Sequence, residues 1–347
     1  PGARRSRMLA LALLLPVAPQ GMSAPIPPGS TVAVTGPTGK LGRLAVKQLV
    51  AEGYKARCLL RHDVASAGEA SGAPDAPKEA VAAWLMAMPG VEFCKGDVTD
   101  RASVDELLKG CSAVLALHGA RRMTKPADLL PWSNPESDPT HSKRVNYDGV
   151  RNLVEAAAAS GTCTRIVRVT GKGEDPFSPF SILINGLGSM AKAFNYEGEA
   201  LLRKEGARVP YTVVRPGIMG AGDETLGEDR ALALADNGGD LPVSRIPHAC
   251  VAQLCVASLA HGNAARATLT AMTVPRGEGE LSWAPLLARV KPDTRQFPAT
   301  LLAKHRLAVR VGGGAIACAM LAAAAGAWKA AAAALGLLAK GARALRT

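Results

Sequence analysis

The stretch TGPTGKLGR, residues 35–43, decides the fold together with its flanks. The apolar run at 31–34 before it predicts a strand, and the helical pattern after it predicts a helix over 40–52. Gly36 permits a tight turn, Gly39 lets a phosphate approach the backbone, and Gly42 lets helix and strand pack closely. Backbone amides and the positive end of the helix dipole then face the place where a pyrophosphate binds. The stretch therefore predicts a dinucleotide-binding strand–helix unit.

The rest of the central chain alternates between short apolar runs and helical periods. The expected strands are 31–35, 55–60, 91–95, 113–117, 165–170, 211–215 and 271–274. The expected helices are 40–52, 101–108, 147–160, 191–205 and 248–261. This alternation predicts an α/β fold, a doubly wound Rossmann-type parallel sheet of about seven strands with a C-terminal apolar helical extension.

Three connections are longer than usual and are expected to be loops: 66–89, 119–143 and 172–190. The last two follow the carboxyl ends of strands, where ligands bind in open α/β sheets. Both are candidates for a substrate lid or a docking surface. The apolar stretch FSPFSILINGLG within the last favours burial against a further surface.

Residues at the tips of the later strands bear on the coenzyme. Arg61 ends the second strand and offers a cation for a 2′-phosphate, where an acidic residue would bind a 2′-hydroxyl. NADP is therefore favoured and NAD is the alternative; a solvated arginine is the competing interpretation. Asp97 follows the third strand and is placed to reach the adenine. His118 and Gly119 close the fourth strand, beside the expected nicotinamide ribose.

Charge is concentrated at the two ends of the chain. The formal net charge is +12, but residues 1–30 and 301–347 contain basic residues and no acidic ones, so the centre is close to neutral. This pattern favours a membrane surface and argues against a nucleic-acid groove. The seven cysteines show no zinc-type spacing, so we expect no metal site and reduced thiols.

The chain is expected to divide into three parts. Residues 1–30 have the basic, apolar and small-residue order of a targeting remnant, or form an arm against a partner. Residues 31–300 form the NAD(P)-binding domain, with a small substrate or lid portion at its end. Residues 301–347 form a basic apolar tail, in which 311–328 carry no charge. That tail is expected to be embedded in or lie on a membrane, or to dock on another subunit.

The central chain resembles the atypical, NmrA-like branch of the short-chain dehydrogenase/reductase superfamily. The resemblance rests on the motifs TGPTGKLGR, GDVTD, VNYDGVRNLVEAAAASG, RIVRVTGKG, EGEALLRKEG and YTVVRPGIM, and covers about residues 31–275. It implies a pyrophosphate site at Gly36, Thr38, Gly39, Lys40, Leu41 and Gly42. It also implies that Arg61 binds the 2′-phosphate, that Asp97 and Val98 border the adenine, and that Pro216 and Gly217 border the nicotinamide.

The catalytic residues of the superfamily are incomplete in this chain. Typical members use a tyrosine as general acid, a lysine four residues later and a serine that orients the carbonyl. Here Tyr196 is followed four residues on by Ala200, whereas Lys192 precedes it by four. Lys192, Tyr196 and Thr170, the last in place of the serine, are the candidate catalytic residues. The competing interpretation makes Tyr196 and Glu199 part of a structural helix under the Arg-Pro-Gly loop.

Two classes of function follow. The first is an accessory subunit or assembly factor of an organellar membrane complex, photosynthetic or respiratory, which binds NADP(H) with chemistry weak or absent. The second is an NADPH-dependent reductase of a hydrophobic carbonyl or enone. Composition and the N-terminal arm favour a plastid and its thylakoid membrane, with the mitochondrial inner membrane as the alternative.

Overall fold

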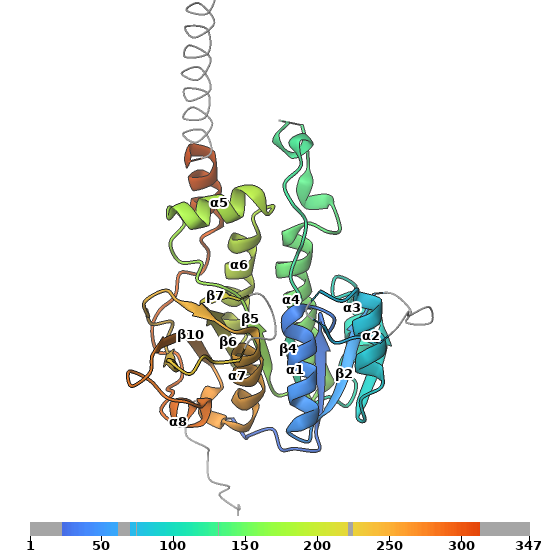
Figure 1. Ribbon diagram of the computed structural model, residues 1–347. Helices are drawn as coiled ribbons and strands as arrows, with labels where there is room; N and C mark the ends of the chain where they lie inside the picture. Colours follow the sequence, from blue (N-terminus) through green and yellow to red (C-terminus); the bar gives the residue numbers. More distant parts are fainter. Residues whose placement is uncertain (1–22, 62–69, 74, 131, 221–224, 313–347) are drawn as a thin grey trace, which may run out of the picture.

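An eight-stranded sheet in the order β3-β2-β1-β4-β5-β6-β10-β8 forms the centre of the molecule (Figure 1). The computed structural model describes residues 23–61, 70–73, 75–130, 132–220 and 225–312. The strands of the sheet are β1 (Thr31–Thr35), β2 (Lys55–Leu60), β3 (Val91–Lys95), β4 (Ala113–Ala116), β5 (Ile166–Val169), β6 (Tyr211–Pro216), β8 (Arg230–Ala235) and β10 (Ala267–Pro275). All neighbouring strands pair in parallel except β10 and β8, which are antiparallel. β7 (Ile218–Met219) and β9 (Arg245–Ile246) pair separately.

Helices cover both faces of the sheet. They are α1 (Lys40–Ala51), α2 (Lys78–Met86), α3 (Arg101–Leu108), α4 (Gly149–Ser160), α5 (Pro179–Leu187), α6 (Ala191–Lys204), α7 (His248–Ala260) and α8 (Trp283–Leu287). Three short 3-10 helices are η1 (Pro126–Leu129), η2 (Pro135–Ser137) and η4 (Gly262–Ala264), and η3 (Lys143–Asp148) is a π-helix. α1 packs on α7 at one face, and α3, α4 and α6 pack at the other (Figure 1).

Alternating side chains of β1 fill two hydrophobic cores. Val32 and Val34 lie in the core beneath α1 and α7, and Ala33 lies in the core beneath α3 and α4. Successive residues of a strand point to opposite faces, so an uninterrupted apolar run is required where both faces are covered. The strand order reverses between β1 and β4, which places the ligand crevice of such a sheet beyond their carboxyl ends.

The fold class predicted from the sequence is confirmed, but several elements were not predicted, among them α2, α5, α8 and β8. The connections 66–89 and 172–190 were expected to be loops, but they contain α2 and α5. Strand β8 was not expected and adds an antiparallel edge beside β10. The two helices begin at proline or directly after it, a residue that fits the first helical turn because it needs no donor there.

The tail lies largely outside the described residues. Residues 302–312 are helical, and the rest of the uncharged segment 311–328 belongs to the part that is not described, as do residues 1–22 of the N-terminal segment. Within the described ranges, no helix combines the length and the hydropathy needed to cross a bilayer.

Candidate functional site

The glycine-rich loop lies at the carboxyl end of β1, against the end of β4. Gly36 has a φ of +72°, a left-handed conformation that favours glycine. A Cβ there would lie 3.0 Å from the Cα of His118. A Cβ at Gly42 would lie 2.9 Å from the Cα of Pro37 and closer still to the carbonyl oxygen of Gly36. The loop can therefore close on itself and on β4 only if both positions are glycine.

The start of α1 is open to solvent. Its N-cap residue, Gly39, makes no side-chain capping bond, and both Gly39 and Lys40 are exposed. Thr38 and Leu41 are half-buried beside them. A Cβ at Gly39 would meet only the carbonyl oxygen of Gly36, at 3.4 Å, so packing within the protein does not require glycine there. An uncapped helix start with exposed backbone fits a phosphate group.

His118 joins the ends of β1 and β4. Its Nδ1 lies 2.7 Å from the hydroxyl of Thr35. The guanidinium of Arg168, on β5, donates to the carbonyl oxygens of Ala116 and His118 at 3.0 and 2.6 Å. Burial, together with the charge of Arg168, holds the pKa of His118 well below its usual value. His118 is therefore neutral near pH 7 and fixes the strand ends beside the loop, while Gly119 after it is exposed.

Three cations gather beyond β2 and β4. Arg61 directly follows β2, Lys78 begins α2, and Arg121 follows β4; all three are exposed. Partial burial lowers the pKa of Lys78, and repulsion by Arg121 and Arg61 lowers it further. Positive charges repel one another, so placing three of them close together is unfavourable unless an anion binds between them. This arrangement is therefore typical of an anion-binding site.

Asp97 and Val98 lie next along this edge of the sheet. One oxygen of the Asp97 carboxylate accepts from both the amide and the hydroxyl of Thr99, each at 2.9 Å. Val98 is buried, and its carbonyl oxygen accepts a hydrogen bond of 3.0 Å from Asn152 on α4. The turn is thus held in place.

Pro216 and Gly217 end β6 on the opposite side of the crevice. The amide of Gly217 donates to the carbonyl oxygen of Ala271 at 2.9 Å. A Cβ at Gly217 would lie 2.6 Å from the sulfur of Met272. Close packing between strands therefore accounts for this glycine.

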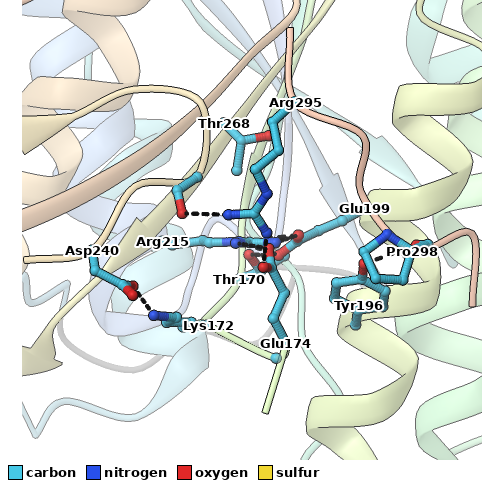
Figure 2. A network of polar contacts seen from close by, with 12 residues as sticks. Thr170, Lys172, Glu174, Tyr196, Glu199, Arg215, Asp240, Thr268, Arg295 and Pro298 are labelled. Carbon is cyan, nitrogen blue, oxygen red and sulfur yellow. Dashed lines mark hydrogen bonds and ion pairs between the residues drawn. The ribbon is translucent and has the colours of Figure 1, made fainter. Parts of the chain in front are cut away.

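The candidate catalytic side chains are engaged by other parts of the protein. Tyr196 is fully buried, and its hydroxyl donates to the carbonyl oxygen of Pro298 at 2.8 Å (Figure 2). Lys192 donates instead to the hydroxyl of Ser181 at 2.9 Å, and burial lowers its pKa to about 8. Thr170 donates to Glu199 at 2.5 Å. The three come from neighbouring elements, but their polar atoms have different partners.

A buried ionic network surrounds Glu199 (Figure 2). The Nε of Arg215 lies 3.1 Å from each oxygen of Glu199, and Arg203 lies 3.1 Å from one of them. Arg215 also pairs with Glu174 at 2.6 Å, and Arg295 pairs with Glu174 as well. Glu199 is thus bound directly to Arg215, near the end of β6.

The C-terminal strap, defined as residues 293–302, closes over this network. The guanidinium groups of Arg203 and Arg295 lie over the ring of Phe297, 4.2 and 4.5 Å from its centroid. Glu197 accepts from the amides of Leu301 and Leu302 at 3.0 and 3.1 Å. The strap therefore lies against α6, where Pro298 and Leu301 contact Tyr196 and Glu197.

A separate cavity of about 580 Å³ lies between β8 and β9 and is lined in part by Leu226, Arg230 and Ile246. No group of three or more histidine, cysteine or acidic side chains able to hold a metal is present within the ranges that the structure covers.

Comparison with known proteins identifies the family of the chain. Residues 36–262 match a family model described as NAD(P)H-binding. The chain belongs to the NAD(P)H-binding family. NAD(P)(H) is its cofactor, as the glycine-rich loop predicted, and the predicted membership of an NAD(P)-binding family is confirmed.

The curated proteins that are similar to this chain include both a chloroplast protein and reductases. Protein TIC 62, chloroplastic, of Pisum sativum is 25% identical over 54% of this chain and 32% of its own length. Ceramide reductase of Caulobacter vibrioides is 31% identical over 56% of this chain and 49% of its own. The chain therefore spans about a third to a half of the length of these relatives.

Solved structures agree on the fold. A short-chain dehydrogenase/reductase from Veillonella parvula in complex with NADP superposes with a TM-score of 0.50 at 10% identity, over 73% of this chain and 98% of the other. A protein described as an NAD-dependent epimerase/dehydratase, from Bacillus halodurans, superposes with a TM-score of 0.52 at 15% identity, over 76% and 100%. At such identities the likeness shows the fold alone.

Two features of this NAD(P)H-binding protein were missed from the sequence. Lys78 and Arg121 were not proposed beside Arg61, because both lie in segments that were taken as loops. Arg215, Glu174 and Arg295 were not connected to Glu199, because the contacts join positions far apart in the chain. The available sequence signal for this network was Arg215, an arginine at the end of an apolar strand and directly before Pro216-Gly217.

Proposed function

We propose that this protein is an NADP(H)-binding accessory subunit or assembly factor of an organellar membrane complex, photosynthetic or respiratory, with chemistry weak or absent. The observation that carries the proposal is the engagement of Tyr196: its hydroxyl is buried and bound to the backbone of the strap. A general acid has to reach the reacting oxygen within hydrogen-bond distance. Burial also raises the pKa of Tyr196, which makes its proton harder to transfer.

The other candidate catalytic groups support the same proposal. The hydroxyl of Thr170, which would orient a carbonyl, donates its proton to buried Glu199. Lys192 reaches Ser181 and lies over the ring of Phe180 at 4.9 Å. Each group therefore has a structural role in this conformation.

The cofactor residues are assigned as follows. The pyrophosphate binds at the backbone of Gly36, Thr38, Gly39, Lys40, Leu41 and Gly42; the adenine lies beside Asp97 and Val98; and His118, Pro216 and Gly217 border the nicotinamide end. The cations Arg61, Lys78 and Arg121 bind the 2′-phosphate and give a preference for NADP(H) over NAD(H).

Removal of the cation cluster tests this preference. We expect Arg61→Ala combined with Lys78→Ala to weaken NADPH binding by about tenfold or more, because two charge-assisted contacts to the phosphate are lost. NADH binding should change little. Titration calorimetry with both coenzymes measures the two affinities, and Lys47→Ala, an exposed lysine of α1, is the matched control for loss of charge. Equal weakening for NADH and NADPH would contradict the assignment.

The location proposed is a plastid, at the thylakoid membrane, with the mitochondrial inner membrane as the alternative. The named chloroplast relatives in Pisum sativum and Arabidopsis thaliana support the plastid. The basic residues of the tail support a membrane surface, since they favour anionic headgroups.

A second function is an NADPH-dependent reductase of a hydrophobic carbonyl or enone. It is favoured by the cavity of about 580 Å³ near β8 and by the reductase names among the relatives, which include cinnamoyl-CoA reductase of rice.

Fractionation of native membranes discriminates between the two functions. We expect the full chain to migrate with a photosystem or respiratory complex when mild detergent extracts are separated by size, with NADPH remaining bound. A soluble monomer that consumes NADPH with a carbonyl substrate, and loses this activity in Tyr196→Phe, would overturn the proposal and establish the reductase. Unchanged turnover in both Tyr196→Phe and Lys192→Ala would exclude Tyr196 and Lys192 as the catalytic pair, but it would not exclude the reductase activity itself.

A further inference from the structure

Exposed apolar side chains gather at one end of the molecule. Nine of the fourteen large hydrophobic residues that are exposed in the described chain come from three segments: the region of α5, the connection after β4 and the helix at 302–312. We call them the apolar face; they are Phe177, Phe180, Leu183, Leu187, Met123, Leu130, Trp132, Leu307 and Val311. Trp132 is 80% exposed. A patch of this kind on a folded protein marks an interaction site.

The three segments are bound to one another. The amide of Thr124 donates to the carbonyl oxygen of Leu187 at 2.7 Å. Asn185 of α5 bonds to His305 at 3.0 Å, and Arg306 pairs with Glu136. In Figure 1 they all project from the same end of the molecule, above the sheet. The apolar face is therefore held by the fold rather than formed by loose loops.

The basic charge at the face comes chiefly from the helix at 302–312. In the connection after β4, Asp128 and Asp138 are both paired with Arg122, at 2.6 and 2.9 Å. The helix at 302–312 adds Lys304, Arg306 and Arg310 and no acid. Exposed aromatic and aliphatic groups flanked by basic residues are the composition of a surface that lies on an anionic bilayer.

The chain leaves the described part from this same face. Gly312 ends the described helix beside Ile182 of α5, and the sequence beyond it stays uncharged to Trp328 and contains basic but no acidic residues up to Thr347. A protein partner would need complementary acidic groups, whereas an anionic lipid surface matches both the apolar and the basic residues.

We propose that the apolar face docks directly on a lipid bilayer with anionic headgroups. The proposal rests on the membrane role given above and assigns the surface that performs it. Phe180, Leu183 and Trp132 enter the interfacial region, and Lys304 and Arg310 lie at the headgroups.

Flotation with pure lipid vesicles tests the proposal. The full chain is mixed with vesicles of phosphatidylglycerol and phosphatidylcholine in equal parts, or of phosphatidylcholine alone. We expect binding to the anionic vesicles that weakens with salt. Phe180→Asp combined with Leu183→Asp should reduce the partition coefficient by about tenfold or more, because two apolar contacts with lipid are replaced by charges.

Two variants serve as comparison. Val243→Asp combined with Leu281→Asp changes residues that are 75% and 61% exposed away from the face, and should bind as the wild type does. Trp132→Asp, from a different segment, should also weaken binding. An unchanged thermal shift with NADPH verifies that each variant is folded.

Other outcomes would overturn the proposal. Equal binding of all variants would place lipid contact elsewhere in the chain. A wild type that binds native organelle membranes and not pure vesicles would identify a protein as the occupant of the face. In that second case co-migration with a membrane complex would persist, so failure of this inference is separate from failure of the proposed function.

Discussion

Replacement of Glu199 by alanine is expected to lower the free energy of unfolding by about 3–5 kcal/mol. Glu199 and Arg215 are both fully buried, so removal of the carboxylate leaves a guanidinium in the interior with fewer partners. Arg203 and Thr170 lose an acceptor at the same time. Urea unfolding at neutral pH measures the change.

Two control variants separate charge from packing. Thr170→Val removes one donor to Glu199 and should cost only about 1 kcal/mol. Glu199→Gln keeps the shape of the side chain without its charge, so its cost in stability should lie between those of Thr170→Val and Glu199→Ala. A cost for Glu199→Ala below that of Thr170→Val would mean that the ionic network contributes little to stability.

The same network gives a pH dependence with a defined sign. Burial by itself would raise the pKa of Glu199, but Arg215, Arg203 and Thr170 outweigh it and hold the pKa below the usual 4.5. A carboxyl group with a lowered pKa in the folded state stabilises fully above its unfolded value and loses this contribution as the pH falls through the folded value. Stability should therefore drop below about pH 4.5 in the wild type, and less so in Glu199→Gln.

The second large effect is expected at the glycine-rich loop. Gly42→Ala should destabilise the protein by about 1–3 kcal/mol and abolish the thermal shift with NADPH, because the added Cβ collides with the backbone of Gly36 and Pro37. Differential scanning fluorimetry with and without coenzyme measures both changes.

Gly39→Ala is the matched control, since its Cβ meets no protein atom closer than 3.4 Å. It should cost under about 1 kcal/mol in stability and still weaken NADPH binding, because the methyl group occupies the approach of the phosphate. Unweakened NADPH binding in Gly39→Ala would remove the pyrophosphate from this helix start.

The parts of the fold that were predictable are those with local signals. The unit β1–loop–α1 can be predicted because an apolar run, three glycines and a helical period follow one another within about twenty residues. α5 was not predicted, although Ser178 caps it and Pro179 occupies its first position. The connection 172–190 was interpreted as a loop because it is longer than usual. Strand β8 has the sequence RALALA, in which alanine gives little strand preference.

The candidate site divides in the same way. The loop residues and Arg61 follow from position along the strands, whereas Lys78 and Arg121 join Arg61 only after folding. The partners of Tyr196, Thr170 and Lys192 could not be read from spacing, since Pro298 lies 102 positions away from Tyr196 in the chain. Contacts of that range depend on how the last segment returns over α6.

The strap also determines how the molecule would sit on a surface. Asp293 accepts from Tyr211 of β6 at 2.9 Å, and His305, just past the strap, lies 2.9 Å from the carbonyl oxygen of Gly173. Both ends of the strap are therefore bonded to the body of the protein, and the final helix is anchored at its base. A molecule attached to a surface by that helix would keep its coenzyme crevice at a constant distance and orientation relative to that surface.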